Sequence, residues 1–461
     1  MKQIFVTIFI YGKFSSQVSR LNLVLAKDHQ AKSCFLFSAL SASVPPISAY
    51  SQQQLDELSK YATDHSDYSK EKIPERILHA TGYGAYGYFE VTNDITHLSE
   101  DCVFLSKPGR QIPIVARFSM GSGGRNVPDS SHDNRGLAIR FMSECGIWDV
   151  VSSTFDIFFF KDPQIVPSFI LAEQQKDAKK IWELRASNPE STFHTIMANS
   201  FLGAPENSRH TNMAAVHTFR LIAANGTRTY AKFHFISEQG AKYNNITRSK
   251  ELSKNLNHAR EDLHNAIANG DYPSWKLMIQ TMSFEQAKKV PFDVLDSTFS
   301  WPRDEFPLQP VGRIVLNRNP QNYTAELEVV AFNPGYLSPG IEASNDPVLQ
   351  YRIHSYPIVQ RHRLGSDYKL LSRLHKNFSP RDQGPANADD VVRDDLKDVK
   401  NFAQAAKWYQ SRPTEEQQQI LQLIADALRG IPSELRDKVL ANYDRVDNQL
   451  GKAVRETGRW L

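Results

Sequence analysis

The sequence predicts an α+β fold in which an antiparallel β-barrel is followed by a smaller helical region. Between about Arg76 and Leu371, short apolar runs alternate with polar residues, which is typical of strands that are buried on one face. Asn225-Gly226 joins two such runs and predicts a β-hairpin with a type I′ turn, because both residues tolerate positive φ. After Pro413 the apolar residues take helical spacing.

The chain divides into five parts along its length. Residues 1–50 are an N-terminal extension, and residues 51–75 are a helical, polar-faced N-terminal arm. Residues 76–371 are the barrel core, residues 372–398 a wrapping segment or linker, and residues 399–461 a C-terminal helical domain. The wrapping segment is assigned because it mixes acidic and basic residues around a Gly-Pro pair and has few large apolar groups.

Strands are expected throughout the core. The hairpin pairs residues 217–224 with residues 227–235. Further strands are expected at residues 112–118, 137–141, 155–160, 312–316 and 325–332. These segments supply enough antiparallel strand to close a barrel.

The tail is expected to hold an antiparallel helix pair that packs on the barrel. Thr414 and Gln417 form a capping box at the start of the first helix, and Gly430 is placed to end it. A second helix is expected to begin at Pro432-Ser433.

The amino-acid composition limits which binding partners and which cellular compartment can be expected. Of 461 residues, 41% are hydrophobic and 23% charged, which suits a globular protein with a large core. A net charge of +3 is too small to indicate a nucleic-acid or membrane surface. Three cysteines far apart in the sequence, without metal-ligand spacing, favour a reducing, intracellular compartment.

The stretch from Asp346 to Gly365 carries the chemistry around which the other motifs are arranged. Arg352 and Tyr356 are four residues apart, so they share one face of a helix, and the guanidinium favours the phenolate form of the tyrosine. A phenolate is a hard anionic ligand for ferric iron. Pro357 is expected to end the helix directly after this ligand.

Further motifs follow one another in a fixed order along the chain. They are Pro74-Glu-Arg-Ile-Leu-His79, Arg117-Phe-Ser119, Asn134-Arg-Gly136, residues 265–275, residues 310–320, Pro339-Gly-Ile-Glu342 and the Tyr356 stretch. In sequence and order they resemble the haem catalases, from about Glu71 to Val454. The resemblance implies an eight-stranded antiparallel barrel, a bound haem b and hydrogen peroxide as substrate, which is dismutated to water and oxygen. The first 50 residues do not match the family.

The resemblance also implies roles for single residues. His79 is the expected acid and base that moves a proton between the two peroxide oxygens, and Ser119 is expected to hold its second ring nitrogen. Tyr356 is the expected iron ligand and Arg352 its partner. Arg76, Arg117 and Arg363 match the arginines that pair with the haem carboxylates, while Phe158 and Phe332 match aromatics that pack on the macrocycle.

Several positions near the expected pocket depart from the family. Thr154 takes the place of an asparagine that orients the peroxide, although an alignment shifted by one residue places Ser153 there. A hydroxyl offers one donor where an amide nitrogen offers two, so we expect peroxide to be oriented less well and dismutated more slowly than in a typical catalase. Gly121 replaces a valine that narrows the channel, which would admit larger molecules.

These departures support an alternative function. A catalase-like haem oxidase or oxygenase of the chanoclavine synthase type, acting on an organic substrate in alkaloid biosynthesis, fits Thr154 and Gly121. A protein that only carries haem would be expected to have lost His79 or Tyr356, and both are present.

The resemblance also bears on NADPH binding, oligomeric state and cellular location. Arg209, His210 and Trp301 match a surface NADPH site, but Ile236 and Arg303 depart from it, so binding of NADPH is open. The resemblance implies a homo-oligomer, a tetramer or a dimer. The C-terminus is not of the peroxisomal Ser-Lys-Leu type, and a cytoplasmic or peroxisomal location is expected.

Overall fold

The computed structural model describes residues 73–100, 105, 107–143, 146–365, 368, 390–396 and 398–460. Most of the expected arm, residues 51–72, and most of the wrapping segment lie outside these residues, so those two predictions stay predictions. Within them, no helix is both long enough and apolar enough to cross a membrane.

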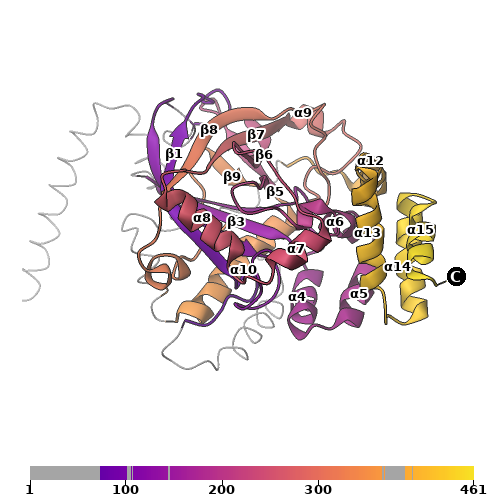
Figure 1. Ribbon diagram of the computed structural model, residues 1–461. Coiled ribbons are helices and arrows are strands. Elements are labelled where there is room, and N and C mark those ends of the chain that lie inside the picture. Colours follow the sequence, from indigo (N-terminus) through magenta and orange to yellow (C-terminus); the bar gives the residue numbers. More distant parts are fainter. Residues whose placement is uncertain are drawn as a thin grey trace, which may run out of the picture.

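Eight antiparallel strands close into a barrel, as predicted (Figure 1). They are β1 (Gly82–Val91), β2 (Gln111–Met120), β3 (Arg135–Ser143), β4 (Gly146–Ser153), β5 (Met213–Ile222), β6 (Arg228–Ser237), β7 (Ser274–Ser283) and β8 (Gln309–Arg318). Neighbours in the chain pair with one another, β1 also pairs with β8, and Ser153 pairs with Ala214 to close the gap between β4 and β5. A short β9 (Ile341–Ala343) adds to β5.

The barrel interior is filled by large side chains from alternate positions of the strands. Phe89, Phe141, Trp148 and Phe233 are at most 1% exposed and meet ring to ring across the interior. Because alternate residues of a strand face opposite sides, this packing fixes which residues of β2, β3 and β4 turn toward the other side of the barrel wall.

Helices connect the strands and form a second core. The connections hold α4 (Ile165–Gln175), α5 (Ala178–Ser187), α6 (Ser191–Ala198), α7 (Ile246–Leu252), α8 (His258–Ala268), α9 (Phe284–Ala287), a π-helix (Thr324–Glu328) and α10 (Pro347–Leu364), with short 3₁₀ turns at Phe201–Gly203 and Asp394–Leu396. The C-terminal region holds α12 (Phe402–Gln410), α13 (Thr414–Ala427), α14 (Ser433–Val446) and α15 (Leu450–Gly458).

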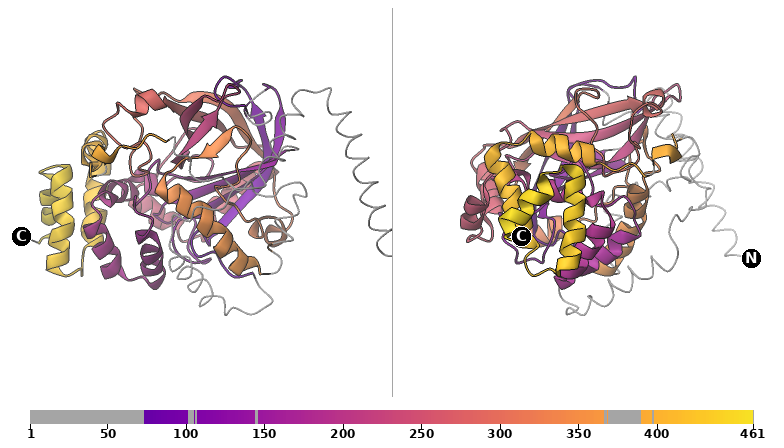
Figure 2. Two further views of the ribbon diagram at one scale, coloured as in Figure 1. Left: turned by 180° about the vertical axis from the view of Figure 1, so that it is seen from behind. Right: turned by 90° about the vertical axis from the view of Figure 1, so that its right-hand side faces the viewer.

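The C-terminal helices stand at one end of the molecule beside α4 and α5 (Figures 1 and 2). Trp182 of α5, Phe193 of α6, Ile424 of α13 and Leu440 of α14 share one apolar core. The prediction that these helices pack on the barrel is therefore wrong in detail. They pack mainly on the helices inserted between β4 and β5, because those helices present the apolar face.

Two of the predicted strands are wrong. Residues 155–160 are an irregular segment, in which the Phe158 N–H donates to the Ser297 carbonyl at 2.7 Å instead of to a strand. A continuous apolar run does not distinguish a buried strand from other buried backbone. Residues 325–332 begin in the π-helix. There the Glu326 carboxylate accepts from the N–H groups of Gln321 and Asn322, and Glu328 turns inward to a group of arginines.

Three predicted turns and helix ends also need correction. The hairpin forms, but only Gly226 has positive φ (81°), so its connection is not a type I′ turn. Pro413 is the N-cap of α13 and no side chain caps it, so there is no capping box at Thr414. Helix α10 does not end at Pro357 but continues to Leu364. The carbonyl of Ile353, which a proline at 357 leaves without its helical donor, accepts from Asn333 Nδ2 at 3.4 Å.

Candidate functional site

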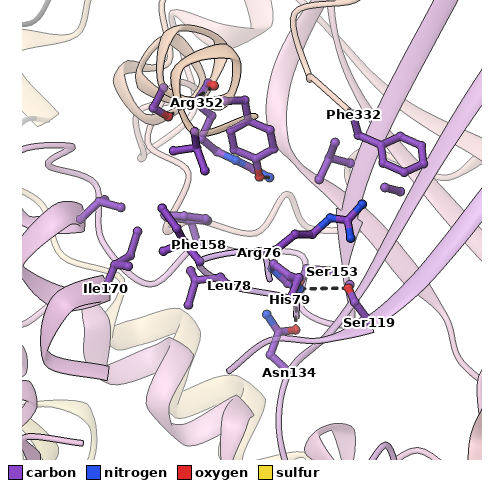
Figure 3. Close-up of a pocket in the computed structure, with 18 of the residues that line it drawn as sticks. Arg76, Leu78, His79, Ser119, Asn134, Ser153, Phe158, Ile170, Phe332 and Arg352 are labelled. Atoms are coloured by element: carbon purple, nitrogen blue, oxygen red, sulfur yellow. Dashed lines mark hydrogen bonds between the residues drawn. The ribbon is translucent and has the colours of Figure 1, made fainter. Parts of the chain in front are cut away.

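A cavity of about 630 Å³ lies between the outer side of the barrel wall, α4 and α10. His79, Ser119, Asn134 and Ser153 line one side of it, from the ends of β1 to β4 (Figure 3). Tyr356 and Arg352 of α10 line another part. The cavity therefore brings together the residues that the sequence had suggested for proton transfer and for holding iron, which are up to 277 positions apart (356 minus 79).

His79 is held in a backbone conformation that few side chains adopt. Its φ is 60°, in the left-handed region, and such residues persist only where their surroundings fix them. The N–H of His79 donates to the Gly121 carbonyl at 3.3 Å, and its own carbonyl accepts from Arg117 at 2.9 Å. A Cβ on Gly136 would stand 3.0 Å from the imidazole, so only glycine lets the ring lie there.

The imidazole of His79 is neutral over the ordinary pH range. Burial, followed by the charges of Arg117 and Arg352, lowers its pKa to about 3. Ser119 Oγ lies 3.0 Å from Nδ1, which leaves Nε2 as the ring nitrogen available to the cavity. A neutral imidazole held through one nitrogen is suited to accept a proton at the other and to return it.

The structure separates Thr154 from Ser153. Ser153 lines the cavity, whereas Thr154 is not among the lining residues. The Thr154 hydroxyl instead accepts from the Arg135 N–H at 3.1 Å and donates to Asn134 Oδ1 at 2.9 Å. The position assigned to Thr154 on the cavity wall is therefore wrong. The alternation of a strand decides this, and a shift of one residue at the end of β4 reverses the side that each residue faces.

Tyr356 is the end of a chain of hydrogen bonds. Arg352 donates to the Tyr356 hydroxyl at 2.6 Å through one nitrogen and to His217 Nε2 at 2.8 Å through another. Because the guanidinium can only donate, Nε2 must accept, and the proton of His217 lies on Nδ1. That nitrogen donates to Asp346 Oδ2 at 2.6 Å. The other oxygen of Asp346 caps α10 by accepting from the N–H groups of Val348 and Leu349.

The three predicted carboxylate-binding arginines surround a carboxylate of the chain itself. Arg76 lies 2.6 Å from Glu328, and Arg117 and Arg363 lie 3.9 and 3.7 Å from it. Burial would raise the pKa of Glu328, yet these guanidiniums hold it below its usual value. Burial and the neighbouring Arg117 lower the pKa of Arg76 to about 10. Three buried cations on one carboxylate leave surplus positive charge facing the cavity.

The remaining predicted residues lie at the cavity as well. Phe158 and Phe332 both line it, with Phe158 stacked on Phe159 at 4.1 Å between ring centres. Leu78 and Val166 add apolar wall. Gly121 is not a lining residue, so the widened channel expected from it is not observed there.

The cavity suits a haem. It offers a tyrosine oxygen that a guanidinium stabilises, apolar and aromatic walls for a flat macrocycle, and surplus arginine charge for its carboxylates. The donor set therefore agrees with the group that the motifs imply.

Sequence reasoning missed four residues that shape the site, namely Asn134, His217, Glu328 and Asp346. Asp346 was visible as a helix-capping residue before Pro347, but nothing in the sequence joins it to His217, 129 positions away. Asn134 was noted only as part of a motif.

Comparisons with known proteins agree with this geometry. A family model described as catalase matches residues 54–415, and one described as catalase-related immune-responsive matches residues 395–457. A catalase of Glandirana rugosa is 36% identical over 413 residues, which cover 80% of this chain and 78% of that protein. A catalase of Rattus norvegicus is 43% identical over 289 residues, covering 61% of this chain and 55% of the rat protein. The solved structure of catalase A from Saccharomyces cerevisiae aligns with a TM-score of 0.77 at 30% identity, covering 90% of this chain and 95% of that one.

Proposed function

Because this chain belongs to the catalase family, we propose that it is a haem-dependent oxidoreductase that converts two molecules of hydrogen peroxide into two of water and one of oxygen. The observation that carries this proposal is the cavity in which a half-buried, neutral His79 and an arginine-bound Tyr356 occur together. A ferric haem b bound through Tyr356 would supply the two-electron redox chemistry that dismutation needs.

His79 moves the proton in this proposal. Its Nε2 accepts a proton from one peroxide oxygen and returns it to the other, which is the proton transfer that uneven cleavage of the O–O bond requires. Ser119 holds Nδ1 and therefore keeps the ring in one orientation throughout. Because the imidazole starts neutral, no proton has to be removed from it before the reaction.

Tyr356 and the arginines would hold the cofactor. Arg352 keeps positive charge beside the phenolic oxygen, and His217 with Asp346 fixes the direction in which Arg352 points. Arg76, Arg117 and Arg363 would bind the haem carboxylates with the charge that Glu328 leaves uncompensated.

Oxygen evolution from peroxide, measured per haem, tests the proposal. The wild-type protein is expected to evolve oxygen rapidly, and His79→Ala to lower kcat/KM by at least about a hundredfold, the usual contribution of a general acid and base. His79→Ala should retain the absorption spectrum of the bound haem. Equal rates for the two proteins would overturn the role of His79.

Four further predictions concern an organic substrate, the oligomeric state, the cellular location and NADPH. Oxidation of an organic substrate is not favoured, since the relatives and solved structure described above are all named catalases. We retain a homo-oligomer, a tetramer or a dimer, and a cytoplasmic or peroxisomal location as predictions. NADPH also stays a prediction: Arg209 already donates to Asp262 at 2.8 Å and to Asp271 at 3.1 Å, so a nucleotide phosphate would compete with two carboxylates.

A further inference from the structure

Asn134 is the side-chain amide on the His79 side of the cavity. It directly precedes β3 and lines the cavity together with His79, Ser119 and Ser153. In Figure 3 the nitrogen of its amide lies on the side away from the bond to Ser153. Neither the family resemblance nor the proposed mechanism had given this side chain a role.

Two hydroxyl groups fix which way the amide points. Ser153 Oγ and Thr154 Oγ1 donate to Asn134 Oδ1 at 2.8 and 2.9 Å. Each hydroxyl also accepts from a backbone N–H, that of Phe155 at 3.2 Å for Ser153 and that of Arg135 at 3.1 Å for Thr154. Because Oδ1 accepts the protons of both hydroxyls, Nδ2 is left toward the cavity.

The same bonds exclude the two hydroxyls as donors to a substrate. Each hydroxyl has one proton, and both protons are used on Oδ1. Nδ2 carries two protons and is therefore the donor that this group of three residues presents to the cavity.

Gly121 makes room for this arrangement and ties it to His79. A Cβ on Gly121 would stand 3.2 Å from the Asn134 Cβ and 3.0 Å from its carbonyl oxygen, so a branched side chain there would crowd Asn134. The Gly121 N–H donates to the Asn134 carbonyl at 2.8 Å, and its carbonyl accepts from the His79 N–H at 3.3 Å. The backbones of Asn134 and His79 are thus connected through a single residue.

We propose that Asn134 is a catalytic residue whose Nδ2 donates to hydrogen peroxide beside His79, with Ser153 and Thr154 acting as positioning residues for its amide. This inference rests on the proposed function. It assigns to Asn134 the peroxide-orienting role that the sequence comparison had expected at position 154, and it explains the glycine at position 121 as space for the amide. No bond is made or broken by Asn134 itself, since the amide orients one peroxide oxygen while His79 exchanges the proton.

The test compares Asn134→Ala with a matched control, Gln175→Ala, which removes another amide that lines the same cavity. Two quantities are measured on haem-loaded protein: kcat/KM for oxygen evolution, and the dissociation constant of cyanide at the ferric iron. We expect Asn134→Ala to lower kcat/KM by about 10- to 100-fold, the range expected for loss of one hydrogen bond to a charged group. The cyanide dissociation constant should rise about tenfold, because the bound anion loses the same donor. Gln175→Ala should leave both quantities unchanged.

A second variant keeps the test decisive if Asn134→Ala fails to fold or to bind haem. Gly121→Val leaves Asn134 in place but crowds it, and should weaken cyanide binding in the same direction. If every variant that binds haem keeps the wild-type affinity for cyanide, the inference is wrong. A wild-type protein without oxygen evolution would instead overturn the proposed function, and the cyanide measurement would still decide whether Asn134 donates into the cavity.

Discussion

At the scale of single residues, His79 is a half-buried histidine whose surroundings determine how the protein responds to pH. Burial and two nearby guanidiniums lower its pKa from the usual 6.5 to about 3. The base is therefore available from about pH 4 upward and is lost as pH falls through about 3.

We predict a pH profile of kcat/KM for oxygen evolution that stays flat from about pH 5 to pH 8 and falls only toward pH 3. The measurement is the initial rate at low peroxide across this range, with the haem spectrum recorded at each pH. A midpoint near 6.5 would mean that His79 titrates as an exposed histidine and that its environment differs from the one described.

The same shift acts on stability. Between about pH 3 and pH 6.5 the unfolded chain takes up a proton at this histidine and the folded chain does not. Stability from this residue is therefore complete above pH 6.5 and declines as pH falls toward 3, and His194, whose pKa is likewise lowered to about 3, adds to the decline.

At the scale of elements, α10 carries Tyr356, and residues far away in the sequence stabilise both its first turn and its backbone at Pro357. Asp346 caps its first turn and holds His217, and Asn333 donates to the carbonyl that Pro357 leaves without a helical partner. The position of the tyrosine thus depends on contacts that lie outside the helix.

We predict that Asp346→Ala lowers the free energy of unfolding by about 1–3 kcal/mol, from the lost cap and the partner lost to His217. Because Arg352 then loses its orientation, the absorption spectrum of the bound haem should also change. The control is Asp177→Ala, which removes the cap of α5 by breaking its bond to the Lys180 N–H. It should lower stability by a similar or smaller amount, measured by chemical denaturation, with an unchanged spectrum. A spectral change in both variants, or in neither, would contradict the link from Asp346 to Tyr356.

Among the elements, those that depend on local sequence patterns could be predicted from the sequence. The paired strands and the Arg352–Tyr356 spacing were predictable, because periodicity and helical geometry are local. The π-helix at Thr324–Glu328 was not predictable. Its alternating Ala-Glu-Leu-Glu pattern is typical of a strand, and the sequence does not show that Glu328 pairs with arginines far away in the chain. The continuation of α10 past Pro357 depends on Asn333, which the sequence does not connect to it.

At the scale of the whole molecule, the C-terminal helices support one wall of the cavity from a distance. They share a core with α5 and α6, and α4, which packs beside α5, contributes Val166 and Ile170 to the cavity. A region without site residues is therefore connected to the cavity wall through α5 and α4.

We predict that Leu440→Ala, which empties a fully buried position of that core, lowers the free energy of unfolding by about 2–5 kcal/mol. Thermal unfolding followed by circular dichroism measures the loss. The rate of oxygen evolution per haem should stay close to wild type at low temperature, because Leu440 is not among the residues that line the cavity. A large fall in rate without a fall in stability would show that the helical core acts on the site directly.

Site residues were predictable to the extent that each carries its own motif. His79, Ser119 and Tyr356 come to the cavity as the motifs imply. The position of Thr154 was wrong by one residue, because the side that a strand residue faces changes at every step. Asn134 was out of reach, since its direction is set by hydroxyls 19 and 20 positions away.

We infer that this cavity dismutates hydrogen peroxide without a second substrate. The most direct test of this inference is the oxygen yield of the haem-loaded protein in buffer that contains hydrogen peroxide and no organic reductant. We expect one molecule of oxygen for every two of peroxide consumed. Peroxide consumption that stops, or that proceeds without this yield until an organic reductant is added, would contradict it.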